Sequence, residues 1–232
     1  MPVQVPLPFV FHGTQDFDSY FAGPNQQVIE SLKALTQPDK GGHFLFIRGD
    51  PGLGKSHLLQ ATCRAASQFD QSTFYMPFRE CTTLSPSLLE GLEAYRLVCV
   101  DDIDSIAGKS DWETAFFHFF NRHREKANNL VVSASLSPQR LPIQLRDLAS
   151  RLQWGLSLDI KEMSDTDKLG ALTLKAKRLG FNLPQEVGRF LLSRYPRDLP
   201  ALWSLLETLD YTSLSEQRKL TIPFLKSHLP ER

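Results

Sequence analysis

The residues with the clearest chemistry lie in the stretch GDPGLGKS, from Gly49 to Ser56, which follows the spacing G-x-x-x-x-G-K-[ST]. Glycines at this spacing let several backbone N–H groups turn towards one anion, and the start of a helix adds partial positive charge. We expect Lys55 to reach the terminal phosphates of a nucleotide and the Ser56 hydroxyl to bind Mg²⁺. The residues predicted to bind the nucleotide here are Asp50, Pro51, Gly52, Leu53, Gly54, Lys55, Ser56 and His57.

Two carboxylates further along the chain suit the same chemistry. The apolar run LVCVDD ends in Asp101 and Asp102. Asp101, at the end of a predicted buried strand, is placed to hold Mg²⁺, and Asp102 is placed to orient an attacking water. An acid directly after the metal ligand favours hydrolysis over phosphoryl transfer to a small metabolite, which argues against a nucleotide kinase. The cofactors expected from both stretches are ATP or ADP with Mg²⁺.

Short apolar runs that alternate with helical patterns must position these residues. The runs cover 43–49, 72–78, 96–102, 129–135 and 155–160, and the helical patterns cover 25–35, 54–68 and 111–127. Such alternation predicts a parallel sheet covered on both faces. We therefore expect an α/β fold with a five-stranded parallel sheet between helices. Asn25 is the expected N-cap of the first helix.

From Ser164 onward the sequence shows helical patterns only. The first of these helices is expected to follow Ser164, a good N-cap, and to end at Gly180. The predicted organisation is an extended N-terminal tail at 1–12, an α/β nucleotide-binding domain at 13–162 and a small helical lid domain at 163–232.

Composition narrows the function further. The 232 residues include 26 Lys and Arg against 26 Asp and Glu, so no basic excess indicates direct binding to nucleic acid. No apolar run approaches the roughly 20 residues that span a bilayer, and no signal peptide is evident. Cys63, Cys81 and Cys99 lack metal-ligand spacing and suit reduced thiols, so a cytoplasmic location is expected.

The N-terminal tail contains the stretch QVPLPF, from Gln4 to Phe9. Prolines at positions 2, 6 and 8 disfavour both a helix and a central strand, because each removes a backbone donor and fixes φ. The apolar residues around them are nevertheless too numerous for a solvated tail. An extended segment of this kind should dock, either on the body of its own chain or on a partner.

Together these features resemble the AAA+ ATPases, and within them the DnaA branch, over essentially the whole chain. The stretches that carry the resemblance are 17–32, 49–56, 97–108, 145–160 and 194–210. The resemblance implies that Phe21 packs on the adenine with Asn25 close by, and that Arg197 in the lid senses the nucleotide of the same chain. It also implies that Arg151 is an arginine finger, which projects to the γ-phosphate held by a neighbouring subunit. Arg140 and Arg146 lie close enough in sequence to be confused with it.

One departure from the DnaA pattern concerns the end of the fourth strand. This strand ends VVSAS, where the family usually has an acidic or amide residue, so Ser133 or Ser135 must serve as sensor, and we assign Ser135 a catalytic role. A hydroxyl positions water less firmly. We therefore expect weak ATPase activity of the chain itself, with ADP as the state that the resemblance implies.

The layout of the chain also differs from that of DnaA. The sequence ends after the lid pattern, where DnaA continues into a DNA-binding domain, and QVPLPF stands in place of its helicase-interaction domain. QVPLPF looks like the Q-x-x-L-x-[LF] peptides that bind the replication sliding clamp (the polymerase beta subunit). In such a peptide Gln4 would form hydrogen bonds, and Leu7 and Phe9 would fill an apolar pocket. The resemblance thus implies a negative regulator of replication initiation that docks on the DNA-loaded clamp and stimulates hydrolysis of DnaA-bound ATP through Arg151.

Two alternatives stay open at this level. A helicase loader or clamp loader would work by its own ATP turnover, so robust ATPase activity without DnaA would favour it. A nucleotide-bound adaptor without a catalytic contribution would not need Arg151. In each case AAA+ edges make self-association expected, while contact with DNA is expected to be weak or indirect.

Overall fold

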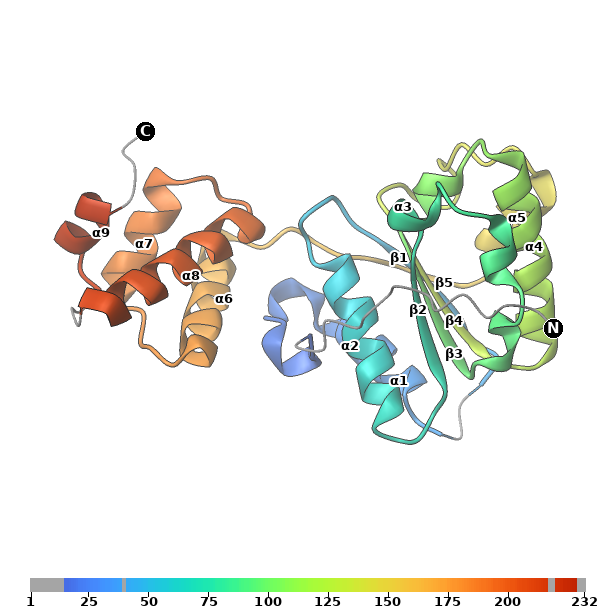
Figure 1. The fold of residues 1–232 in the computed structure, drawn as a ribbon, viewed down its shortest axis with the longest axis horizontal. Coiled ribbons are helices and arrows are strands. Elements are labelled where there is room, and N and C mark those ends of the chain that lie inside the picture. The colour runs from blue at the N-terminus through green and yellow to red at the C-terminus, as the bar shows by residue number, and fades with distance from the viewer. Residues whose placement is uncertain (1–14, 39–40, 217–219, 229–232) are drawn as a thin grey trace.

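The computed structural model describes residues 15–38, 41–216 and 220–228, which form an α/β body and a group of helices joined to it by an extended segment (Figure 1). The body contains one sheet whose strand order is β2-β3-β4-β1-β5, and every neighbouring pair is parallel. The strands are β1 Phe44–Arg48, β2 Thr73–Pro77, β3 Leu97–Asp101, β4 Asn129–Ala134 and β5 Leu156–Asp159. The predicted five-stranded parallel sheet is confirmed.

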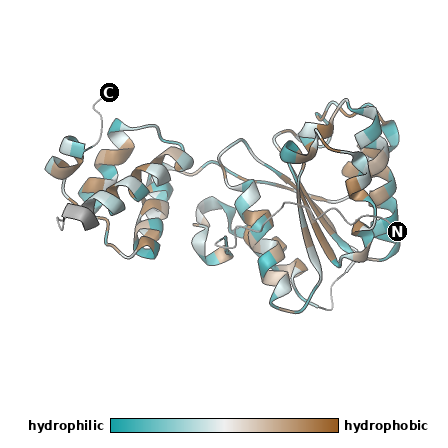
Figure 2. Cartoon of the chain, viewed as in Figure 1, coloured by the Kyte–Doolittle hydropathy of each residue, from teal (hydrophilic) through white to brown (hydrophobic). Residues whose placement is uncertain are grey.

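Helices cover both faces of this sheet, and alternate strand residues point to different cores. In β1, Leu45 and Ile47 pack with the helices α1 (Gln26–Leu35) and α2 (Lys55–Ser67). Phe46 lies in the other core, with α4 (Ser110–Glu125) and α5 (Arg146–Leu152). The same core includes α3 and 3-10 turns after β2 and β3: α3 Phe78–Cys81, η3 Pro86–Leu89, η4 Leu92–Ala94 and η5 Ile103–Ile106. Figure 2 shows apolar residues running along the central strands, as expected for strands buried on both sides.

The described residues of the lid form four helices around a leucine-rich core of their own. They are α6 Asp165–Leu179, α7 Gln185–Arg194, α8 Leu199–Glu216 and α9 Ile222–His228. Helix α6 begins as predicted, since Ser164 and Asp167 form a capping box, and it ends at Gly180, whose φ of +96° lies in the left-handed region. Within the described residues, no helix has both the length and the apolar character needed to cross a membrane.

A short segment before α1 ties the lid to the body, and we call residues Asp16–Asn25 the strap. It includes the 3-10 turns η1 Phe17–Ser19 and η2 Gly23–Asn25. Arg178 of α6 donates two hydrogen bonds to the Asp16 carboxylate, at 3.1 and 3.0 Å. The ring of Phe21 lies directly against Gly170 of the same helix.

Asn25 closes the strap, and the prediction that its side chain caps α1 is wrong. It precedes the helix but makes no capping hydrogen bond. Its amide instead donates to the Lys161 carbonyl at 3.0 Å and accepts from the Lys161 N–H at 2.7 Å. The reason is tertiary, because Lys161 begins the extended segment between β5 and the lid, whose backbone groups have no sheet partner there.

The close contact between Phe21 and Gly170 yields a stability prediction. A Cβ at Gly170 would lie 2.5 Å from Phe21 Cζ, so Gly170→Ala should lower the free energy of unfolding by about 1–3 kcal/mol. In a Phe21→Ala background the ring is absent, and the same change should raise it by up to about 1 kcal/mol, because alanine is the better helix former. Urea titration of the two pairs measures both effects. An effect of the same sign in both backgrounds would contradict the packing described here.

Candidate functional site

The phosphate loop connects β1 to α2 in the predicted strand–loop–helix arrangement. Gly52 and Gly54 have φ values of +85° and +88°, which side chains rarely tolerate, so the turn requires glycine. The first N–H groups of α2 have no intrahelical partner and are available to an anion. Tyr20 of the strap closes the loop from outside, since its hydroxyl donates to the Leu53 carbonyl at 3.1 Å and its ring packs on Gly54.

Lys55 lies between the loop and the two acids. Its side chain is buried, with 6% of the residue exposed, and its Nζ donates to the Gly49 carbonyl at 2.8 Å. The same Nζ is 3.9 Å from Asp102 Oδ1. This position brings the loop lysine and the acid at the end of β3 into one site, as the sequence predicts for a nucleotide site.

Asp101 and Asp102 stand at the end of β3 in different surroundings. Asp101 is buried and accepts hydrogen bonds from the Tyr75 hydroxyl at 2.8 Å and from the Ser133 hydroxyl. Asp102 is only partly buried and has a left-handed backbone conformation, with φ of +54°. Its N–H donates to Ser133 Oγ at 3.0 Å, so one serine at the end of β4 fixes both acids.

The groups around Asp102 change the pKa of its carboxylate. Burial and the neighbouring Asp101 raise the pKa of Asp102, while Lys55 and Arg79 act against that rise. Arg79 lies 3.1 Å from the other carboxylate oxygen, Asp102 Oδ2. A carboxylate with a raised pKa accepts a proton more readily, which suits a residue that orients and polarises water.

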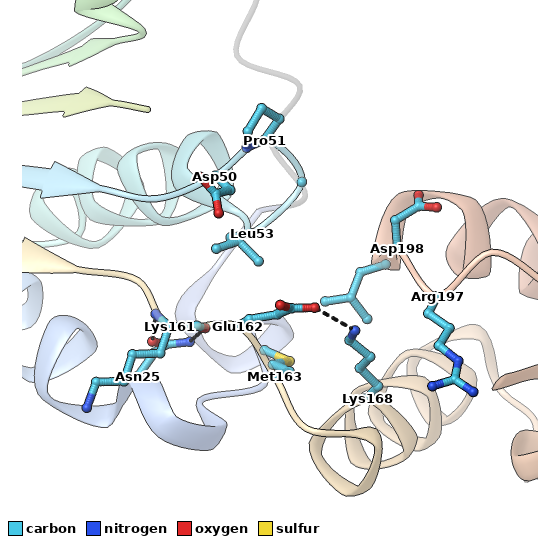
Figure 3. A pocket seen from close by; sticks show the side chains of 12 residues that line it. Asn25, Asp50, Pro51, Leu53, Lys161, Glu162, Met163, Lys168, Arg197 and Asp198 are labelled. Atoms are coloured by element: carbon cyan, nitrogen blue, oxygen red, sulfur yellow. Dashed lines mark hydrogen bonds and ion pairs between the residues drawn. The ribbon is translucent and has the colours of Figure 1, made fainter. Parts of the chain in front are cut away.

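A cavity of about 360 Å³ lies between the loop and the lid. Figure 3 shows Asp50, Pro51 and Leu53 on the body side, facing Lys168, Arg197 and Asp198 of the lid. Asn25, Gly52, Lys161, Glu162, Met163 and Leu199 complete the lining. Arg197 donates to the Leu192 carbonyl at 3.1 Å and to Asp165 at 3.3 Å, so its guanidinium is held at the lid side of the cavity.

Two family models match adjoining parts of this architecture. The model described as the bacterial DnaA ATPase domain matches residues 84–159, and the model described as the lid domain of Hda matches residues 165–229. The chain is an Hda-like AAA+ protein of the DnaA branch. The first match includes Asp101, Asp102 and α5, and the second includes nearly the whole described lid.

Solved structures of AAA+ proteins share the fold of this Hda-like chain. Domain III of the replication initiation protein DnaA from Thermotoga maritima is 23% identical with a TM-score of 0.79, covering 95% of this chain and 99% of that one. AMPPCP-bound DnaA from Aquifex aeolicus is 22% identical with a TM-score of 0.69, covering 90% and 70%. The Holliday junction branch migration motor RuvB of Thermotoga maritima is 12% identical with a TM-score of 0.66, covering 88% and 68%. These likenesses show the AAA+ α/β fold with a helical lid.

Arg151 lies apart from the nucleotide cavity of its own chain. Its guanidinium carbon is 3.9 Å from the ring centroid of Trp154, and that of Arg124 is 4.5 Å from the same ring. Trp154 lines a second cavity together with residues at the starts of three strands: His43, Phe44, Leu130 and Leu156. The phosphate loop follows the other end of β1. A five-residue strand spans roughly 16 Å, so Arg151 stands near the opposite edge of the sheet.

Other predicted residues have partners outside the cavity. The His57 ring nitrogen Nε2 lies 2.9 Å from the Asp16 carbonyl and 3.1 Å from Ser19 Oγ, so this side chain packs under the strap. Phe21 is not among the cavity residues, because its ring packs on α6. The Ser135 N–H donates to the Asp104 carboxylate at 3.0 Å. Gln4, Leu7 and Phe9 lie outside the described residues.

Sequence reasoning missed four side chains of this site. Tyr75 and Arg79 contact the two acids, Tyr20 covers the loop, and Lys168 lines the cavity. Only 9% of Lys168 is exposed, and its Nζ is 3.1 Å from Glu162 Oε1. For Tyr75 a signal existed, since a strand next to β3 must place alternate residues beside the acids.

The donor set of the site suits Mg²⁺. Ser56 and Asp101 offer hydroxyl and carboxylate oxygens, which Mg²⁺ prefers together with phosphate oxygens. Each Asp101 oxygen accepts one hydrogen bond from the protein and keeps a second lone pair for a metal-bound water. Among the described residues no group of three or more His, Cys, Asp or Glu side chains forms a separate metal site.

The two hydrogen bonds of Asn25 give a second stability prediction. Asn25→Ala should lower the free energy of unfolding by about 2 kcal/mol or more, because it leaves the Lys161 N–H and carbonyl without their partners. Gln26→Ala is the matched control: this neighbouring amide makes one exposed hydrogen bond, to Glu30, and its removal should cost a few tenths of a kcal/mol at most. Urea unfolding of both variants decides between them. Equal, small effects would mean that the amide does not hold the segment before the lid.

Proposed function

We propose that this Hda-like protein is a nucleotide-bound negative regulator of replication initiation. It binds ADP or ATP in the cavity between loop and lid, docks on the DNA-loaded sliding clamp through its tail, and stimulates hydrolysis of DnaA-bound ATP. Nucleotide binding is supported by the loop geometry and by AMPPCP-bound DnaA among the proteins of the same fold. The regulatory role is supported by the Hda-type lid on a DnaA-type body.

The observation that carries the proposal is the position of Arg151 away from its own phosphate loop. An arginine near the opposite edge of the sheet is of no use to the nucleotide of the same chain, but it is presented to a neighbour. Arg151 stacks on Trp154, half of which is exposed, so its guanidinium lies close to the surface. Such a cation stabilises the charge that develops on a transferring phosphoryl group.

The chain's own residues would hold its nucleotide and hydrolyse it slowly. Lys55 and the backbone N–H groups of the loop bind the phosphates, Arg197 and Lys168 face them from the lid, and Ser56 and Asp101 hold Mg²⁺. When bound, Mg²⁺ neutralises phosphate charge. Slow hydrolysis is expected because the fourth strand ends in serines, where the DnaA family usually has an acidic or amide residue.

The finger role predicts a selective loss of activity. Arg151→Ala should leave ADP affinity and clamp binding unchanged, yet cut the stimulated hydrolysis of DnaA-bound ATP by roughly 10³-fold or more, as the loss of an arginine finger does. The measurement is single-turnover hydrolysis of ATP on DnaA with this protein and DNA-loaded clamp. Arg146→Ala, in the same helix, is the control and should retain activity, whereas Lys55→Ala should lose ADP binding.

Other results of that assay would identify a different function. If Arg151→Ala lowers the stimulated hydrolysis by less than about threefold, the protein acts as an adaptor without a catalytic contribution. Vigorous ATP turnover by the wild-type chain without DnaA would instead favour a helicase loader or clamp loader that works by its own hydrolysis.

If the tail binds the clamp, changes in the tail should weaken clamp binding without lowering the thermal stability of the protein. Changing Leu7 and Phe9 to Ala should abolish clamp binding with little change in Tm, because anchors that serve a partner contribute to the interface. Two large apolar side chains buried in the fold would instead cost several kcal/mol of stability. Gln4→Ala should weaken binding by leaving polar groups of the clamp unpaired.

The matched control for the tail is the pair Val3→Ala and Val5→Ala, which shortens apolar residues of the same segment outside the Q-x-x-L-x-F positions. Surface plasmon resonance with immobilised clamp measures binding, and thermal melting measures stability. If the Leu7/Phe9 variant melts several degrees lower and still binds the clamp, the tail packs on the body of its own chain rather than on the clamp.

A further inference from the structure

The hydroxyl of Tyr75 connects the two residues that would hold Mg²⁺. It donates to Asp101 Oδ2 at 2.8 Å, and Ser56 and Gln60 of α2 interact with the same hydroxyl. Tyr75 therefore lies where the first turns of the phosphate-loop helix meet the carboxylate at the end of β3. Its role is distinct from that of the loop residues, because it reaches the metal ligands from a third element, β2.

The sheet register explains how a residue of β2 reaches this place. Tyr75 pairs with Cys99 of β3, and Asp101 lies two residues further along the same strand. Side chains two apart in a strand share one face, and Cys99 belongs to the core beneath α2. Tyr75, Asp101 and the Ser56–Gln60 row of α2 are thus on one side of the sheet.

A second donor holds the other oxygen of the same carboxylate. The Ser133 hydroxyl donates to Asp101 Oδ1 and accepts from the Asp102 N–H at 3.0 Å. With both oxygens fixed and 3% of the residue exposed, the carboxylate has one orientation. Its remaining lone pairs are then aligned before a metal ion arrives.

We propose that Tyr75 is a positioning residue for the Mg²⁺ site: its hydroxyl orients the Asp101 carboxylate and links it to Ser56. Tyr75 thereby sets how strongly Mg²⁺ tightens nucleotide binding. The inference rests on the proposed nucleotide site. Outer partners of metal ligands commonly contribute 10–100-fold to metal affinity. Ser133 shares the task, so its hydroxyl is committed to the acids rather than to sensing the γ-phosphate.

The experiment compares ADP affinity of the full chain in excess MgCl₂ and in EDTA. In wild type, Mg²⁺ should tighten binding of a fluorescent ADP. In Tyr75→Phe, the affinity in EDTA should match wild type, while the gain from Mg²⁺ should fall by about tenfold or more. Asp101→Asn removes a metal ligand and should also lose the gain from Mg²⁺. A merely structural role would weaken binding equally in both buffers.

Tyr95→Phe is the matched control, because its ring packs on Phe74 in the core on the other face of the sheet, and it should keep the full gain from Mg²⁺. Ser133→Ala removes the second hydrogen-bond donor to Asp101 and should also lose the Mg²⁺-dependent gain in ADP affinity. If Tyr75→Phe does not fold, Ser133→Ala provides the test. A full Mg²⁺ gain in Tyr75→Phe, or in Ser133→Ala where Tyr75→Phe does not fold, overturns the inference. Equal wild-type affinity in Mg²⁺ and EDTA overturns it too but leaves nucleotide binding standing, whereas no ADP binding at all overturns the proposed function as well.

Discussion

The parallel pairing of the central strands is the constraint on which the rest of the structure depends. Because β1, β3 and β4 run in one direction side by side, the phosphate loop, both acids and Ser133 emerge at one edge of the sheet. Lys55 and Asp102 are far apart in the sequence, and the pairing of the strands brings Lys55 Nζ to 3.9 Å from Asp102 Oδ1. The burial of β3 and β4 then fixes these positions, since each strand is packed on both faces and cannot shift without disturbing two cores.

The strap connects the body of the protein to the lid through side-chain contacts. Asp16 contacts the lid through Arg178 and the phosphate-loop helix through the ring of His57, while Asn25 holds the backbone at Lys161. Burial lowers the pKa of His57, so near neutral pH the ring is uncharged and packs without repelling Arg178. The lid is therefore held over the cavity by contacts that include a residue directly after the loop.

Much of this was predictable from the sequence, for reasons that differ from residue to residue. The phosphate loop has a spacing that few other structures need, and the strand runs are apolar because parallel strands are buried on both faces. Ser164 and Gly180 mark the ends of α6 through local backbone chemistry alone. Asn25, Lys168 and Tyr75 were not predictable in the same way. Their partners are distant in sequence, and an asparagine before a helix looks like a cap until the tertiary structure offers its amide a better partner.

The sheet also separates two kinds of chemistry by its two edges. The edge where the strands end carries the phosphate loop, with charges that bind a nucleotide of the same chain. Near the opposite edge lie Arg151, Trp154 and Arg124, where two guanidinium groups share one exposed indole. Cations this close would repel each other in an apolar environment, but an exposed π-face and water make the arrangement tolerable. In the proposed function this surface cation acts on a partner's nucleotide, and the length of one strand separates it from the phosphate loop of its own chain.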